Sequence, residues 1–286
     1  MKPTGRNFFQ IPPILGKYRR SAPLVLVNGL AEQSESWFAN RIAWSRHFDL
    51  KVPELLVYDG GSLHKHINAG GDVTVDYLTD RLATYLDEFV QNPPYHLVGS
   101  SLGGQILLTY AVRHPEKVGR MVLLCPSGLH GEENLPVMEG VRRSQYDTLV
   151  RSVFHRGAFA SEELVDAIGH KFQDRVWKKG ILRTLRGTVG HSVSHLLDQV
   201  PHQTLLIWGL EDHVIADIPG SIQAADRMIA ARQVVIPKCG HAPQIEKSRL
   251  VNKLVLQFLR GKLRSIPPAL DPTRFLKDFR PAALHL

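Results

Sequence analysis

The chain contains short, unbroken apolar runs that end at turn residues. Runs of this kind, which do not alternate with polar residues, are typical of strands buried on both faces of a parallel sheet. Segments between several of the runs repeat apolar side chains every three to four residues, as amphipathic helices do. We predict strands at Leu24–Val27, Leu55–Tyr58, His96–Val98, Met121–Leu124, Leu205–Trp208 and Gln233–Ile236.

Four of these predicted strands are followed by segments with helical periodicity, at residues 34–48, 74–90, 101–114 and 247–260. Strand and helix therefore alternate along much of the chain. This order predicts an α/β fold with a mostly parallel central sheet flanked by helices and joined by right-handed crossovers. The 286 residues, 43% of them hydrophobic, are enough for one large core.

The alternation stops between residues 127 and 200, where several amphipathic patterns follow one another without a clear strand. Helices inserted between two strands would most simply cover one edge of the sheet. We therefore expect residues 1–126 and 201–260 to form the core and residues 127–200 to form a helical cap. A basic, Pro-containing tail follows at 261–286. This tail either packs along the body or is mobile. The side chains through which it would pack are Leu270, Phe275, Leu276 and Phe279.

The formal net charge of +8 makes nucleic acid a partner to consider. No aromatic-interleaved basic pattern or recognition motif accompanies the charge, so we expect no nucleic-acid partner. No apolar run reaches the ~18 residues of a membrane span. The chain has only two cysteines and its first residues lack the pattern of a secretory signal. These features favour a cytoplasmic protein.

The stretch VGSSLGG at residues 98–104 places two serines between a predicted strand and a predicted helix. A nucleophile on a sharp strand-to-helix turn has a strained backbone, and its neighbours two residues before and after must be nearly free of side chains. Gly99 and Gly103 meet this condition for Ser101, whereas Ser100 has larger residues at those positions. The spacing therefore predicts Ser101 as a nucleophile.

A serine hydroxyl needs a base to take its proton and an acid to orient that base. Asp212 and His241 each follow a predicted strand, and the carboxyl ends of parallel strands meet at one edge of a sheet. The order serine, acid, histidine is the one expected on such a sheet. Glu211 and Asp217 are the alternative acids. We favour Asp212, because Glu211 would point away on an extended loop and Asp217 lies farther from the strand end.

Together these motifs resemble the α/β-hydrolase fold family, in the branch of small serine esterases, haloperoxidase-like enzymes and carbon–carbon bond hydrolases. The resemblance covers about residues 22–126 and 203–260. Its motifs are Gly99–Gly104, Trp208–Asp212, Gly240–Pro243 and Asn28-Gly29-Leu30 followed by Ser36-Trp37. Asn28 stands where the family commonly has histidine, and we expect its amide to brace the loop through hydrogen bonds.

The resemblance implies an oxyanion hole made by the backbone N–H groups of Leu30 and Leu102. Losing one such donor costs about 3–4 kcal/mol of transition-state stabilisation. The implied function is a serine hydrolase that cleaves a small-molecule ester or related acyl substrate through an acyl-enzyme, with Ser101, His241 and Asp212 as the triad. No cofactor and no metal are implied.

Other functions remain open at this point. The same triad serves carbon–carbon bond hydrolysis, thioester hydrolysis and acyl transfer, and the sequence does not place the pocket residues that distinguish them. A non-catalytic binding protein of the same fold is less favoured, because all three triad residues are present. His191 and His195 lie four residues apart on a predicted cap helix, but no third ligand is near in sequence, so we interpret them as surface residues.

Overall fold

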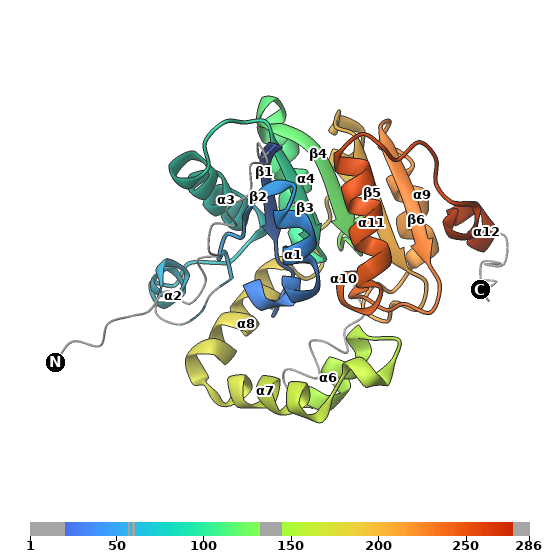
Figure 1. Ribbon diagram of the computed structural model, residues 1–286. Coiled ribbons are helices and arrows are strands. Elements are labelled where there is room, and N and C mark those ends of the chain that lie inside the picture. The colour runs from blue at the N-terminus through green and yellow to red at the C-terminus, as the bar shows by residue number, and fades with distance from the viewer. Residues whose placement is uncertain (1–20, 57, 59–60, 132–144, 277–286) are drawn as a thin grey trace, which may run out of the picture.

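The computed structural model describes residues 21–56, 58, 61–131 and 145–276. Its central sheet has the strand order β2-β1-β3-β4-β5-β6, and all neighbouring strands are parallel (Figure 1). The predicted α/β class with a parallel sheet is confirmed. The strands are β1 (Ser21–Val27), β2 (Phe48–Lys51), β3 (Tyr95–Ser100), β4 (Val118–Leu124), β5 (Thr204–Gly209) and β6 (Ala231–Ile236).

The apolar runs are continuous because both faces of the sheet are buried. In β1, Leu24 and Leu26 belong to the core on one face, whereas Val25 and Val27 belong to the core on the other. Successive side chains of a strand point to opposite faces, so a strand covered on both sides carries apolar residues at successive positions along most of its length.

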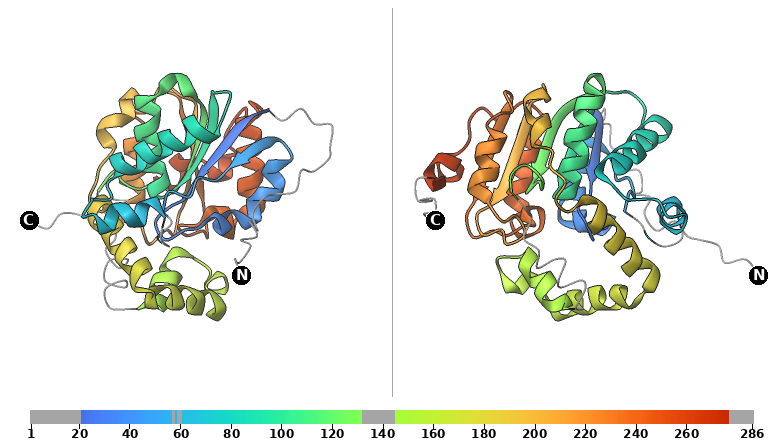
Figure 2. Two further views of the ribbon diagram at one scale, coloured as in Figure 1. Left: turned by 90° about the vertical axis from the view of Figure 1, so that its left-hand side faces the viewer. Right: turned by 180° about the vertical axis from the view of Figure 1, so that it is seen from behind.

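Helices cover the two faces of the sheet, as the two further views in Figure 2 show. One face carries α1 (Phe38–Ser45) and α11 (Ser248–Leu259), and the other carries α3 (Val75–Phe89), α4 (Leu102–Arg113) and α9 (Ile218–Ala225). The remaining short helices are α2 (Ser62–Asn68), α10 (Pro243–Glu246), α12 (Pro272–Leu276), η1 (Ser34–Trp37), η2 (Pro115–Lys117), η3 (Gly157–Phe159), η4 (Ser194–Gln199) and η5 (Pro268–Leu270).

Three further helices lie beyond the carboxyl ends of the strands (Figure 1): α6 (Tyr146–Val153), α7 (Glu162–Gln173) and α8 (Arg175–Thr188). Asp174 separates the last two helices. Its backbone is extended and its carboxylate accepts the N–H of Val176 at 2.8 Å, which caps the first turn of α8. We propose that these helices form a cap over the cavity described below.

The prediction of a strand at Leu55–Tyr58 is wrong. Residues 55 and 56 lie in a turn, and the second strand is β2, at the edge of the sheet. The sequence FDLK of β2 has no continuous apolar run, unlike the sequence of β6, the strand at the other edge. Tyr58 is buried for another reason: it packs edge-on against Trp177 of α8, and its hydroxyl lies 2.7 Å from the hydroxyl of Thr184.

Several predicted boundaries change. The helix expected at 34–48 consists of η1 and α1 and ends at Ser45. His191 lies between α8 and η4, so the predicted helix carrying both His191 and His195 is wrong. In the tail, Leu270 is buried and Phe275 and Leu276 pack half-buried against the body.

Phe279 and the first twenty residues lie outside the described residues. Within the described ranges, none of the helices has the length and apolar character needed to span a bilayer.

Candidate active site

Ser101 lies on the turn between β3 and α4, with φ +50° and ψ −117°. This is a conformation that residues with a side chain rarely adopt. The glycines on either side make the turn possible. A Cβ on Gly99 would lie 2.8 Å from the backbone of Gly103, and a Cβ on Gly103 would lie 2.3 Å from the carbonyl oxygen of Val27. The turn is therefore packed directly against itself and against β1.

The loop after β1 lies against the Ser101 turn, because β1 and β3 are neighbours and Val27 pairs with Gly99. The strand order reverses at β1, and ligands of parallel sheets bind at such switch points. A Cβ on Gly29 would lie 3.0 Å from the Cβ of Ser101. Asn28 braces this loop: its Oδ1 accepts the indole N–H of Trp37 at 2.9 Å, and its Nδ2 donates to the carbonyl of Gln33.

The two residues expected to supply the oxyanion hole flank Ser101. Leu102 is the first residue of α4, so its N–H belongs to the four N-terminal groups that have no acceptor within the helix. The positive end of the helix dipole at this point favours a developing negative charge. Leu30 lies in the turn after β1 and lines the same cavity as Ser101.

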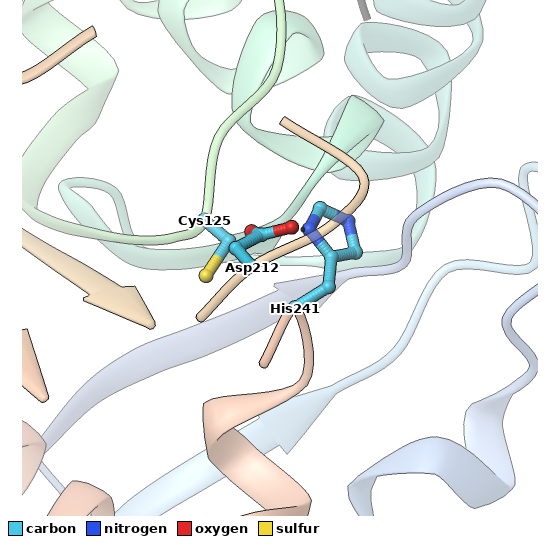
Figure 3. Close-up of side chains that lie close together, drawn as sticks. All are labelled: Cys125, Asp212 and His241. Atoms are coloured by element: carbon cyan, nitrogen blue, oxygen red, sulfur yellow. Dashed lines mark hydrogen bonds and ion pairs between the residues drawn. The ribbon is translucent and has the colours of Figure 1, made fainter. Parts of the chain in front are cut away.

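Asp212 and His241, on the loops after β5 and β6, form a buried pair (Figure 3). Oδ2 of Asp212 lies 2.7 Å from Nδ1 of His241, and Oδ1 accepts the backbone N–H groups of Val214 at 2.8 Å and Ile215 at 3.1 Å. Burial acts to raise the pKa of Asp212, but the charge and hydrogen bond of His241 and the two N–H groups outweigh it and hold the pKa below its usual value. The carboxylate therefore stays ionised beside the imidazole.

The alternative acids contact other groups. Glu211 accepts the backbone N–H of Cys239 at 3.0 Å. Asp217 is the N-cap of α9, accepts the N–H of Gly220 at 2.8 Å and lies 3.3 Å from His130. Of the three candidate acids, Asp212 is the one whose contact with His241 is observed.

The loop that carries His241 is bonded to the proposed cap. The backbone N–H of His241 donates to the carbonyl of Val153 at 2.8 Å. The carboxylate of Glu246 accepts the N–H groups of Gly240 and His155, both at 2.9 Å, and that of Arg156. We call this set of contacts the Glu246 tether. It fixes the histidine loop to the segment that follows α6.

Cys125 lies beside the acid and the base at the end of β4 (Figure 3). Ligand atoms of Cys125, Asp212 and His241 all lie within 4.8 Å of one another. Burial raises the pKa of the Cys125 thiol, so the sulfur is held as a neutral thiol. A metal ion would have to ionise that thiol and displace the hydrogen bond between Asp212 and His241. We therefore interpret the group as a hydrogen-bonded site without a metal.

Ser101 and His241 open into one cavity of about 220 Å³. Its walls come from the loop after β1, from the histidine loop and from α6, α7 and α8. Two polar residues besides Ser101 and His241 are among its described walls, Glu32 and Ser36. Apolar side chains make up most of the remainder: Leu30, Leu149, Val150, Val153, Phe154, Leu164, Ile168, Phe172, Ile181, Leu185, Val189, Val214 and Ile245.

Glu32 is a residue of the candidate site that was not predicted from the sequence. Its carboxylate accepts the backbone N–H of Gly29 at 2.9 Å and the hydroxyl of Ser100 at 2.8 Å. Burial raises the pKa of Glu32, although these two hydrogen bonds and the charge of His241 act against the rise. A carboxyl group in an apolar cavity is the signal that identifies it, and that signal exists only after folding.

Comparisons with known proteins identify the family of the chain. The model of the alpha/beta hydrolase family matches residues 24–254. The chain is 20% identical over 264 residues to monoacylglycerol lipase ABHD6 of Homo sapiens, a match covering 85% of the chain and 77% of the relative. It is 29% identical over 181 residues to a 2-hydroxy-6-oxo-6-phenylhexa-2,4-dienoate hydrolase of Comamonas testosteroni, covering 58% of the chain and 63% of the relative.

A solved structure of a mutant meta-cleavage product hydrolase from Pseudomonas fluorescens IP01 has a similar fold. The TM-score is 0.72 at 21% sequence identity, over 85% of this chain and 92% of that one. This likeness agrees with the strand order and the flanking helices described above. With a family model matching most of its length, the chain belongs to the alpha/beta hydrolase family and is a hydrolase.

Proposed function

We propose that the protein is a serine hydrolase that cleaves an uncharged carboxylic ester with an apolar acyl group. The observation that carries the proposal is the Asp212–His241 pair, which opens into the same cavity as Ser101 on its strained turn. Because Nδ1 of His241 is hydrogen bonded to Asp212, the proposal assigns the role of base to Nε2.

The reaction proceeds in two halves. Nε2 of His241 takes the proton of the Ser101 hydroxyl as Oγ attacks the ester carbonyl carbon, and the N–H groups of Leu30 and Leu102 hold the resulting oxyanion. The carbon–oxygen bond then breaks and His241 gives its proton to the leaving alcohol. Water attacks the acyl-enzyme with His241 again as base, which releases the acid and restores Ser101.

The cavity favours an uncharged ester over a substrate that carries a carboxylate. None of its described lining residues is a lysine or arginine, and Glu32 would repel an anion. The Comamonas relative is described as acting on a dienoate, which is an anion, whereas the human relative is described as a monoacylglycerol lipase. An acyl glycerol ester combines an apolar chain with an uncharged head and matches the lining better.

Labelling with a fluorophosphonate probe tests the nucleophile. The wild-type protein should be labelled, and mass spectrometry of the digest should place the label on Ser101. Ser101→Ala should lose the label while keeping the melting temperature, His241→Ala should lose the label, and Ser100→Ala should still be labelled at Ser101. Labelling that survives Ser101→Ala would refute the proposal.

A substrate panel tests the ester. Three kinds of substrate are compared at equal enzyme concentration: p-nitrophenyl esters of increasing acyl length, a monoacylglycerol and 2-hydroxy-6-oxo-6-phenylhexa-2,4-dienoate. Hydrolysis of the esters with kcat/KM rising with acyl length until the cavity is filled supports the proposal. Faster cleavage of the dienoate than of every ester would instead assign carbon–carbon bond hydrolysis.

A further inference from the structure

Ser100, the serine that precedes the nucleophile, is fully buried. Its hydroxyl donates to Oε1 of Glu32 at 2.8 Å and accepts from Nε2 of Gln244 at 3.4 Å. Glu32 belongs to the loop after β1, and Gln244 to α10, directly after the histidine loop. A serine that served only to turn the chain would need neither contact.

Glu32 joins the two sides of the oxyanion hole. Its Oε2 accepts the N–H of Gly29, the residue before Leu30, and its Oε1 accepts the hydroxyl of Ser100, which is two residues before Leu102. Hydrogen bonds to a carboxylate are shorter and stronger than those between neutral groups. One carboxylate therefore holds the loop that presents one expected donor against the turn that presents the other.

The packing around Gly29 places this carboxylate beside the nucleophile. A Cβ on Gly29 would lie 3.0 Å from the Cβ of Ser101, 3.1 Å from the carbonyl oxygen of Ser100 and 3.3 Å from Cδ of Glu32. Loop and turn are thus in van der Waals contact at the point that the carboxylate bridges. An apolar side chain would fill this space without the cost of burying a charge, so packing alone does not account for a glutamate here.

We propose that Glu32 and Ser100 are positioning residues that hold the N–H groups of Leu30 and Leu102 at the separation an oxyanion requires. The inference rests on the proposed function, because it assigns these two N–H groups to a serine hydrolase. Neither side chain exchanges a proton with the substrate. Both act through the backbone donors, whose placement governs how well the oxyanion is held.

The test is a double-mutant cycle on a p-nitrophenyl ester. Glu32→Gln keeps the shape of the side chain but cannot accept both hydrogen bonds as a carboxylate does, and Ser100→Ala removes the hydroxyl. Each variant should lower kcat by about tenfold to a hundredfold with little change in KM, because a misplaced donor weakens the transition state more than the bound substrate. The double variant should lose about as much kcat as Glu32→Gln alone, since both changes break the same hydrogen bond between Glu32 and Ser100.

The helix η1, which follows this loop, offers a matched control. Ser34 donates to Glu35 at 3.3 Å on the outer surface, two residues from Glu32. The variants Ser34→Ala and Glu35→Gln remove a serine–glutamate contact from the same segment and should leave kcat at the wild-type value.

A boronic acid inhibitor supplies a readout that a change in stability alone would not move. Its tetrahedral adduct with Ser101 places an oxygen in the oxyanion hole, so its affinity should fall in parallel with kcat in Glu32→Gln and Ser100→Ala.

The outcomes separate this inference from the proposed function. Loss of labelling in Ser101→Ala together with wild-type kcat in Glu32→Gln and Ser100→Ala overturns the inference and leaves the hydrolase intact. Additive losses in the double variant, losses confined to KM, or unchanged boronic acid affinity overturn it as well. If Glu32→Gln fails to fold, Ser100→Ala by itself still decides, through kcat and inhibitor affinity. Hydrolysis that survives Ser101→Ala overturns the proposed function.

Discussion

Oδ2 of Asp212 lies 2.7 Å from Nδ1 of His241, while Oδ1 of the same carboxylate accepts two backbone N–H groups from its own loop. Oδ1 therefore fixes the carboxylate of Asp212, and Oδ2 fixes the imidazole of His241. This division places the imidazole in one tautomer and one orientation before any substrate binds.

The first prediction concerns that pair. Asp212→Asn should lower kcat by about 10³–10⁴-fold, because an amide can hold the imidazole in the wrong tautomer without changing its position. Steady-state hydrolysis of a p-nitrophenyl ester measures the loss. Glu211→Gln is the matched control: Glu211 contacts the N–H of Cys239, so its substitution should cost less than about tenfold. Equal losses in the two variants would contradict the assignment of the acid.

A second prediction concerns the packing of the Ser101 turn. A Cβ at Gly103 would lie 2.3 Å from the carbonyl oxygen of Val27 and 2.9 Å from that of Asn28, both of them backbone atoms. Gly103→Ala should therefore destabilise the protein by at least about 1–3 kcal/mol and abolish fluorophosphonate labelling. Gly157→Ala, at a site with no atom within 4 Å of the added Cβ, is the control. Chemical denaturation and labelling of both variants provide the comparison.

Much of the fold could be predicted from the sequence, because β1 and β3 to β6 are covered on both faces and carry unbroken apolar runs. The strand β2 could not, since its sequence FDLK has no such run. The run at Leu55–Tyr58 was misleading, because Leu55 and Leu56 lie in a turn and Tyr58 packs against α8.

The site divides in the same way. The positions of Ser101, Asp212 and His241 after the carboxyl ends of strands were predictable, because the apolar runs of β3, β5 and β6 are visible in the sequence. Glu32 was not: its hydrogen-bond partner Ser100 lies 68 residues later in the chain, and a glutamate in a polar loop is usually solvated. Contacts of this kind depend on tertiary structure, which local patterns do not encode.

A third prediction follows from the raised pKa of Glu32. A group whose pKa is higher in the folded state contributes stability at low pH that is lost as the pH rises through that folded pKa. Glu32→Gln cannot ionise, so it lacks this pH-dependent loss, although it cannot accept both hydrogen bonds. The melting temperature of Glu32→Gln minus that of the wild type should therefore rise between pH 4 and pH 8. A difference that stays constant or falls over this range would contradict the expectation.

A fourth prediction concerns His96 on β3. Burial, together with the charge of Arg120, lowers the pKa of His96 from 6.5 to about 4, and its Nδ1 accepts the backbone N–H of Arg120 at 3.0 Å. The neutral ring therefore contributes stability that is complete above pH 6.5 and is lost as the pH falls toward 4, by at most about 3 kcal/mol.

Urea denaturation at pH 7.5 and pH 4.5 measures this loss. His96→Asn keeps an acceptor for the Arg120 N–H but does not titrate in this range. The variant should lose less stability than the wild type between the two pH values. An equal loss in both proteins would assign the acid sensitivity to other groups.

The Glu246 tether bears on how such an enzyme can be re-engineered. The carboxylate binds main-chain groups of the histidine loop and of residues 155 and 156 at once, and Val153 accepts the N–H of His241 itself. The proposed cap is therefore not an exchangeable module with respect to His241, the proposed base. A cap transplanted from a relative to change specificity must bring a main chain that presents the same N–H and carbonyl groups at these points, or the graft will displace His241 as well.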